Sequence, residues 1–126
     1  MYYTNYQMEE NNQLLNTIIR GIQEKKGRKI AVLDLRNLIG AVCQYFIVCE
    51  GNTPTQVDAI VESVADIVRE ELHEKPVKVV GRENSIWVAM DYTDCMVHVF
   101  VPDYRRFYDI ERLWSDAKTT TIPDED

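Results

Sequence analysis

The chain has 126 residues and a mass of 14.7 kDa, which is the size of one domain. Apolar residues make up 45% and charged residues 28%, a composition that excludes disordered and fibrous proteins. The net charge of -7 and the lack of a basic stripe argue against binding to a nucleic-acid backbone, so we expect little direct nucleic-acid contact. A protein of this charge that works near nucleic acid is better suited to bind a basic protein there.

No apolar run is long enough to cross a membrane, and the first ten residues lack the features of a signal or transit peptide. The three cysteines, Cys43, Cys49 and Cys95, are far apart and form no metal-ligand pair. We therefore expect no membrane partner, no metal, no cofactor and a reducing, cytoplasmic location.

Residues 1–10 are polar and aromatic without a regular period, and we expect a flexible N-terminal arm there. A helix pattern begins at Asn11 or Asn12 and ends at Gly27, since glycine commonly follows a helix C-terminus. The basic cluster over 25–29 falls at this helix end, where cations suit the helix dipole.

Two short apolar runs with β-branched residues, 30–35 and 45–49, predict buried strands. The clearest helix start of the chain follows them. Thr53 stands at the N-cap position, Pro54 at the first helical position and Gln56 three residues after the cap, as in a capping box.

Three more strands are predicted over 77–80, 86–90 and 95–101, and the short polar turns between them favour antiparallel hairpins. A helix is predicted over 102–114. Residues 118–126 are polar and acidic, and we expect a disordered tail there.

These elements predict a single domain over 11–117 with a mixed α/β fold, in which a roughly five-stranded β-sheet carries flanking helices. The strand–helix–strand stretch in the first half should contribute parallel pairing, and the later strands antiparallel pairing.

Carboxylates at strand ends offer one enzymatic interpretation. Asp34 and Asp91, with Asp94 nearby, could hold magnesium for nucleotidyl transfer. However, Arg36 stands where a second ligand should follow Asp34, and no phosphate-binding loop occurs in the sequence. A residual nucleotidyltransferase that uses Asp34 and Asp91 with magnesium therefore remains only an alternative hypothesis.

Trp87 is the most informative candidate for binding. Strand alternation places Trp87, Ala89 and Asp91 on one face and aliphatic residues on the other. A large aromatic side chain beside a small residue and a carboxylate is typical of a binding face. The alternative is a core tryptophan covered by a helix. An exposed tryptophan face could also pair with a second copy of the chain to give a homodimer.

His98, Tyr108 and Trp114 each allow two interpretations. His98 lies inside an apolar strand, which favours a hydrogen-bonded sheet or core residue over a partner contact. Tyr108 and Trp114 belong to the last predicted helix, where they either pack against the sheet or extend the binding face.

Several segments together resemble the Iojap-like ribosomal silencing factor family. The similarity covers roughly residues 11–117, and the order and spacing of its short motifs are specific. One departure is Gln44, where the family usually carries aspartate. The motifs are Val32-Leu-Asp-Leu-Arg36, Tyr45-Phe-Ile-Val48, Gln56-Val57, the run from Trp87 to Phe100, and Arg106-Phe-Tyr-Asp-Ile-Glu-Arg-Leu-Trp114.

The resemblance implies a sheet with flanking helices that is similar to nucleotidyltransferases but lacks their catalytic residues, and a protein that is not an enzyme. It implies binding to the large ribosomal subunit through large-subunit protein fourteen, which blocks joining of the small subunit and represses translation during nutrient limitation. Trp87 is then expected to be the central anchor. Ala89, Asp91 and His98 are its expected neighbours on the same sheet face, with Tyr108 and Trp114 as further candidates.

Overall fold

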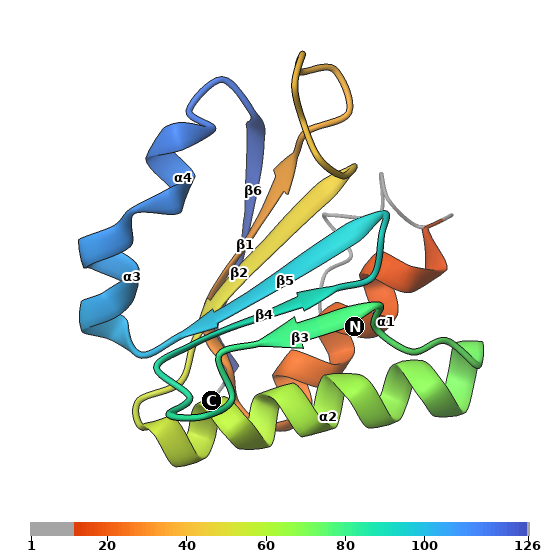
Figure 1. Ribbon diagram of the computed structural model, residues 1–126, viewed down its shortest axis with the longest axis vertical. Helices are drawn as coiled ribbons and strands as arrows, with labels where there is room; N and C mark the ends of the chain where they lie inside the picture. The colour runs from red at the N-terminus through yellow and green to blue at the C-terminus, as the bar shows by residue number, and fades with distance from the viewer. Residues whose placement is uncertain (1–11, 126) are drawn as a thin grey trace.

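A computed structural model describes residues 12–125 of the protein. The N-terminal arm expected over residues 1–10 lies outside these described residues. The elements in chain order (Figure 1) are α1 (Gln13–Glu24), β1 (Arg28–Asp34), β2 (Tyr45–Glu50), α2 (Pro54–Leu72), β3 (Lys78–Val80), β4 (Trp87–Asp91), β5 (Cys95–Phe100), α3 (Pro102–Tyr108), α4 (Ile110–Leu113) and β6 (Lys118–Ile122).

The strands form one six-stranded sheet in the order β3-β4-β5-β2-β1-β6. β2 and β5 pair in parallel, and the other neighbours are antiparallel. This arrangement confirms the mixed α/β sheet and the antiparallel hairpins of β3, β4 and β5. The parallel pair joins β2 to β5 because α2 carries the chain across the sheet before β3, β4 and β5 run back toward β2.

The expectation of a disordered tail over 118–126 is wrong for the residues that form β6, and the count of five strands rises to six. β6 pairs along its whole length with β1 residues Ile30 to Asp34 and so satisfies backbone groups that would otherwise form an open edge. Beyond the strand, Asp124 accepts a hydrogen bond from the Lys29 backbone N–H at 2.6 Å and pairs with Arg28 at 3.1 Å. The domain therefore extends past the predicted boundary at residue 117.

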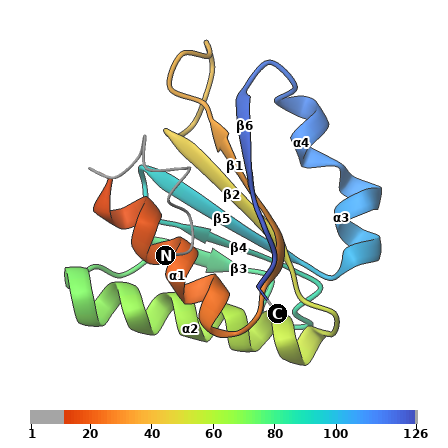
Figure 2. The same ribbon diagram turned by 180° about the vertical axis from the view of Figure 1, so that it is seen from behind.

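Helices α1 and α2 lie side by side against one face of the sheet (Figure 2). Their inward residues are aliphatic, and with the inward residues of the strands they form the larger core. The two helices approach closely at Gly21, where an added Cβ would lie 2.9 Å from Ile67 and 3.0 Å from Val64. Fully buried members of this core include Leu15, Ile18, Ile22, Val57, Ile60, Val64, Val88 and Met90.

The predicted start of α2 is confirmed. The backbone N–H of Gln56 donates to the Thr53 hydroxyl at 3.1 Å, and Pro54 occupies the first turn. The Gln56 carboxamide oxygen accepts from the backbone N–H of Asn52 at 2.8 Å, one residue earlier than a capping box requires. This small shift leaves the helix start well satisfied.

Helices α3 and α4 lie on the other side of the sheet (Figure 1). The single helix predicted over 102–114 is wrong in this respect, because the chain breaks at Asp109, which adopts a left-handed conformation with φ 46°. Aspartate tolerates this conformation better than most residues. α3 buries none of its residues, and α4 buries only Ile110. No helix in the described part of the chain is long and apolar enough to span a membrane.

Candidate functional site

The alternation predicted for β4 is confirmed. Val88 and Met90 are fully buried against the α1–α2 layer, whereas Trp87, Ala89 and Asp91 lie half-buried on the opposite face. The sheet register places Trp87 opposite Phe100, Ala89 opposite His98 and Asp91 opposite Met96. The β4 residues of the expected binding face therefore share one side of the sheet with alternate residues of β5.

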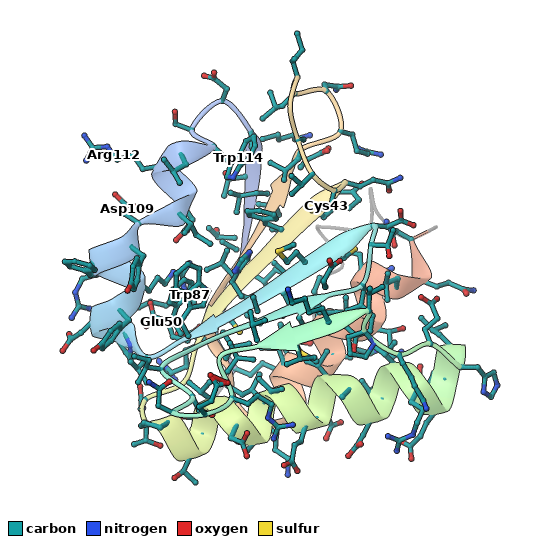
Figure 3. All side chains as sticks on the ribbon, viewed as in Figure 1. Cys43, Glu50, Trp87, Asp109, Arg112 and Trp114 are labelled. Carbon is teal, nitrogen blue, oxygen red and sulfur yellow. The ribbon has the colours of Figure 1, made fainter. Side chains whose placement is uncertain are left out.

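Trp87 contacts neighbouring side chains on several sides but remains partly exposed to solvent (Figure 3). Its ring stacks on Phe100 with centroids 4.9 Å apart and contacts Tyr108 at 4.7 Å. Its indole N–H donates a hydrogen bond to Nδ1 of His98 at 3.1 Å. The turn before β4 also needs glycine, because Gly81 has φ 96° and an added Cβ would lie 2.0 Å from the Trp87 carbonyl oxygen. Trp87 is thus a fixed, partly exposed aromatic ring.

His98 is 5% exposed, so it can affect the site only through the residues that it contacts. Burial lowers the pKa of its imidazole to about 4. The ring is therefore neutral near pH 7, and because Nδ1 accepts from Trp87, the proton resides on Nε2. Nε2 is buried without a hydrogen-bond partner among the described residues, and the ring meets Phe46 edge-on at 4.7 Å. His98 thereby orients the Trp87 indole.

The other site residues expected from the sequence lie at different distances from Trp87. Tyr108 is 45% exposed and contacts Trp87 directly. Trp114 is half-buried and packs edge-on against Phe46 at 6.0 Å, so it packs on the sheet beyond His98. Asp91 uses one carboxylate oxygen to accept from the Thr93 backbone N–H at 2.8 Å, which closes the turn between β4 and β5.

Two residues that sequence reasoning did not select extend the surface around Trp87. Phe107 is 78% exposed and meets Tyr108 edge-on at 5.0 Å, and Tyr104 is 39% exposed with its ring 6.2 Å from Tyr108. The spacing of 104, 107 and 108 along one helix is the signal that could have identified them. We call Trp87, Tyr104, Phe107 and Tyr108 the aromatic face.

The magnesium hypothesis fails on geometry. Asp34 ends β1 and Asp91 ends β4, and two strands lie between them in the sheet. Alternation also directs the two carboxylates to opposite faces, since Asp34 shares the parity of buried Val32 in the α1–α2 core. Arg36 binds Asp34 through 2.9 Å and 2.7 Å hydrogen bonds, which lower the pKa of that carboxyl. Asp34 and Asp91 therefore cannot ligate one ion.

Charge is distributed unequally between the two sides of the molecule. The exposed side of α2 carries five carboxylates, and four of them pair with arginines: Arg69 on the same helix, Arg20 from α1, and Arg82 from the segment between β3 and β4. α3, which carries most of the aromatic face, has both signs in Asp103, Arg105 and Arg106. The acidic residues of α2 are Asp58, Glu62, Asp66, Glu70 and Glu71.

Known proteins resemble this chain over nearly its whole length. The family model described as "Ribosomal silencing factor during starvation" matches residues 8–126. The ribosomal silencing factor RsfS of Halalkalibacterium halodurans is 32% identical over 112 residues, which cover 89% of this chain and 94% of that protein. A crystal structure of a Chromobacterium violaceum protein has a TM-score of 0.78 and 34% identity, and the match covers 82% of this chain and 85% of that one.

A more distant match is a mouse protein named mitochondrial assembly of ribosomal large subunit protein 1. It is 20% identical over 103 residues, which cover 80% of this chain and 45% of that protein.

Proposed function

We propose that this chain, which belongs to the RsfS family of ribosomal silencing factors, silences ribosomes by binding the large subunit through large-subunit protein fourteen. In this proposal the bound protein occupies the surface where the small subunit must dock, so that joining fails and translation falls during nutrient limitation. The action requires occupancy rather than turnover, so no catalytic residue is needed. The name of the mouse relative, which refers to large-subunit assembly, supports a large-subunit partner.

The observation that carries the proposal is the half-buried indole of Trp87 on the sheet face opposite α1 and α2. Its position is fixed by Phe100, Tyr108 and His98, so that little side-chain freedom is lost when a partner covers it. Rigid aromatic anchors beside polar groups are typical of the residues that dominate protein–protein binding energy.

The charge distribution favours a protein over RNA as the partner. The net charge of -7 opposes binding to phosphate, and the acidic side of α2 lies across the sheet from the aromatic face. The aromatic face itself carries charges of both signs and can therefore be covered by a protein without burying a cluster of carboxylates.

The direct test is Trp87→Ala, measured by co-sedimentation with purified large subunits and by the rate of subunit joining. Truncation of an anchor costs about 2–4 kcal/mol, so the affinity should fall by about 30-fold to 800-fold, and joining should recover. Val77→Ala is the control, because Val77 is an exposed apolar residue in the segment between α2 and β3 and should be silent. Circular dichroism and a melting curve establish that both variants fold.

Wild-type affinity of a folded Trp87→Ala variant would reject the aromatic face as the ribosome contact. Sedimentation velocity over a concentration series tests the alternative occupant. If the parent chain dimerises and Trp87→Ala is monomeric, the face also binds a second copy of the chain, and large-subunit binding should then weaken as the protein concentration rises.

A further inference from the structure

Helix α3 presents aromatic side chains but buries none of its own residues. Tyr104, Phe107 and Tyr108 are 39%, 78% and 45% exposed. An isolated helix of this length is unstable in water, and exposed rings contribute little to its attachment. Some other interaction must therefore fix α3 on the sheet.

Arg105 supplies that interaction. Its side chain is 11% exposed and reaches below α3, where Nη1 donates to the Lys29 carbonyl oxygen at 2.7 Å and to Glu50 at 3.3 Å. Its Nε and Nη2 atoms donate to the two carboxylate oxygens of Glu111, each at 3.0 Å. One guanidinium thus ties α3 to β1, to the end of β2 and to α4.

The geometry of these contacts suits arginine alone. A paired approach of Nε and Nη2 to one carboxylate fixes the plane of the guanidinium, which an ammonium group cannot reproduce. Glu50 is 11% exposed in its side chain and loses its cation if Arg105 is removed. The neighbouring Arg106 differs, because it pairs with Asp103 on the same helix and both side chains face solvent, at 67% and 87% exposure.

We propose that Arg105 is a positioning residue of the aromatic face. By fixing α3 against the ends of β1 and β2, it holds Tyr108 against Trp87 and directs Tyr104 and Phe107 toward the ribosomal partner. The inference rests on the proposed function, since it assigns a role to a buried residue of the same binding site. Arg105 contacts the partner only through the residues that it positions.

The test compares Arg105→Met with Arg106→Met in large-subunit binding by the full chain. Arg105→Met should weaken binding about tenfold, a coupling typical of residues in one network. Arg106→Met should weaken it less, because it removes an exposed charge of the same helix and breaks no contact with the sheet. In a ¹H–¹⁵N spectrum, the indole signal of Trp87 should move in Arg105→Met and stay in place in Arg106→Met, because only the first variant releases Tyr108 from the ring.

A triple-alanine variant distinguishes a positioning role of Arg105 from a general effect on stability. In a chain with Tyr104, Phe107 and Tyr108 all replaced by alanine, Arg105→Met should weaken binding no further, because there is nothing left to position. A general loss of stability would instead add to the effect of the alanines. If Arg105→Met does not fold, Glu111→Gln keeps the guanidinium bound to Glu50 and Lys29 while it weakens the link to α4, and should give a smaller shift of the same kind.

Unchanged binding and an unchanged Trp87 signal in Arg105→Met would overturn the inference, as would an additive effect in the alanine background. These outcomes differ from failure of the proposed function, in which Trp87→Ala itself binds large subunits as well as the parent chain does.

Discussion

The two faces of the sheet differ in chemistry and in how fully they are covered. The face under α1 and α2 is aliphatic, with Ile18, Ile60 and Val64 completely buried. The opposite face has a smaller core in which aromatic residues such as Phe100 join aliphatic ones such as Leu33 and Val48, and the helix that borders this face, α3, buries no residue. Stability is therefore concentrated in the first face, which we call the closed face, while the aromatic face retains surface for a partner.

The largest expected effect on stability comes from the closed face. Ile60→Ala removes a completely buried side chain between α2 and the sheet and should lower the free energy of unfolding by about 3–4 kcal/mol. Urea unfolding followed by circular dichroism measures this loss. The folded fraction of Ile60→Ala should bind large subunits with the affinity of the parent chain. A loss of affinity in that folded fraction would contradict the division between the faces.

His98 provides the next largest effect, and it lies on the aromatic side. Its pKa is lowered to about 4 by burial, from an ordinary value of 6.5, so the unfolded chain binds a proton that the folded chain excludes. Stability from this residue is complete above about pH 6.5 and is lost as the pH falls toward 4, up to about 3 kcal/mol. Protonation of Nδ1 would also remove the acceptor for Trp87.

The measurement is the unfolding free energy of the parent chain minus that of His98→Asn, followed between pH 7 and pH 4. Asparagine does not titrate, so the difference isolates His98 from the carboxylates. A difference that is independent of pH would show that the imidazole is not held neutral by its burial.

Loss of the α2 cap should have a smaller effect. Thr53→Ala removes the hydroxyl that accepts from the Gln56 backbone N–H and should lower the free energy of unfolding by about 1 kcal/mol. A thermal melt detects this change, and Thr53→Ser, which keeps the acceptor, serves as the control. Because the cap lies on the closed side, large-subunit binding should be unaffected.

The smallest effect on stability belongs to the aromatic face. Phe107 is 78% exposed, so Phe107→Ser should change the free energy of unfolding by less than about 0.5 kcal/mol. Its affinity for large subunits should nevertheless fall several-fold, which co-sedimentation can measure. A destabilised variant with normal affinity would invert the roles that we assign to the two faces.

Much of this comparison follows from the sequence, because local rules govern it. Period-two alternation placed Trp87, Ala89 and Asp91 on one side, and the Thr53 cap was readable from its pattern. Membership of the silencing factor family was also indicated by the motifs and is confirmed by the matches to the family and its members.

Other features depend on contacts between distant segments. The run from Lys118 to Ile122 lacks an alternating apolar pattern, and it forms a strand because β1 offers an unpaired edge. The helix breaks at Asp109 because this residue adopts a left-handed backbone conformation, which the helical spacing of the apolar residues does not predict. The spacing of Tyr104 and Phe107 places them on one helix face, but their position near Trp87 depends on the contacts that hold α3 on the sheet. Each of these required the tertiary structure.

The acidic side of α2 has a consequence for the speed of encounter. The five carboxylates of α2 outnumber the three arginines that pair with four of them, Arg20, Arg69 and Arg82, so a small excess of negative charge remains on this side. Such a molecule experiences a torque near a phosphate-rich particle. That torque turns the carboxylates outward, so the ring-bearing side leads each collision. The net charge of -7 also repels the whole molecule from such a particle, so we expect association to become faster as added salt shortens the range of the field.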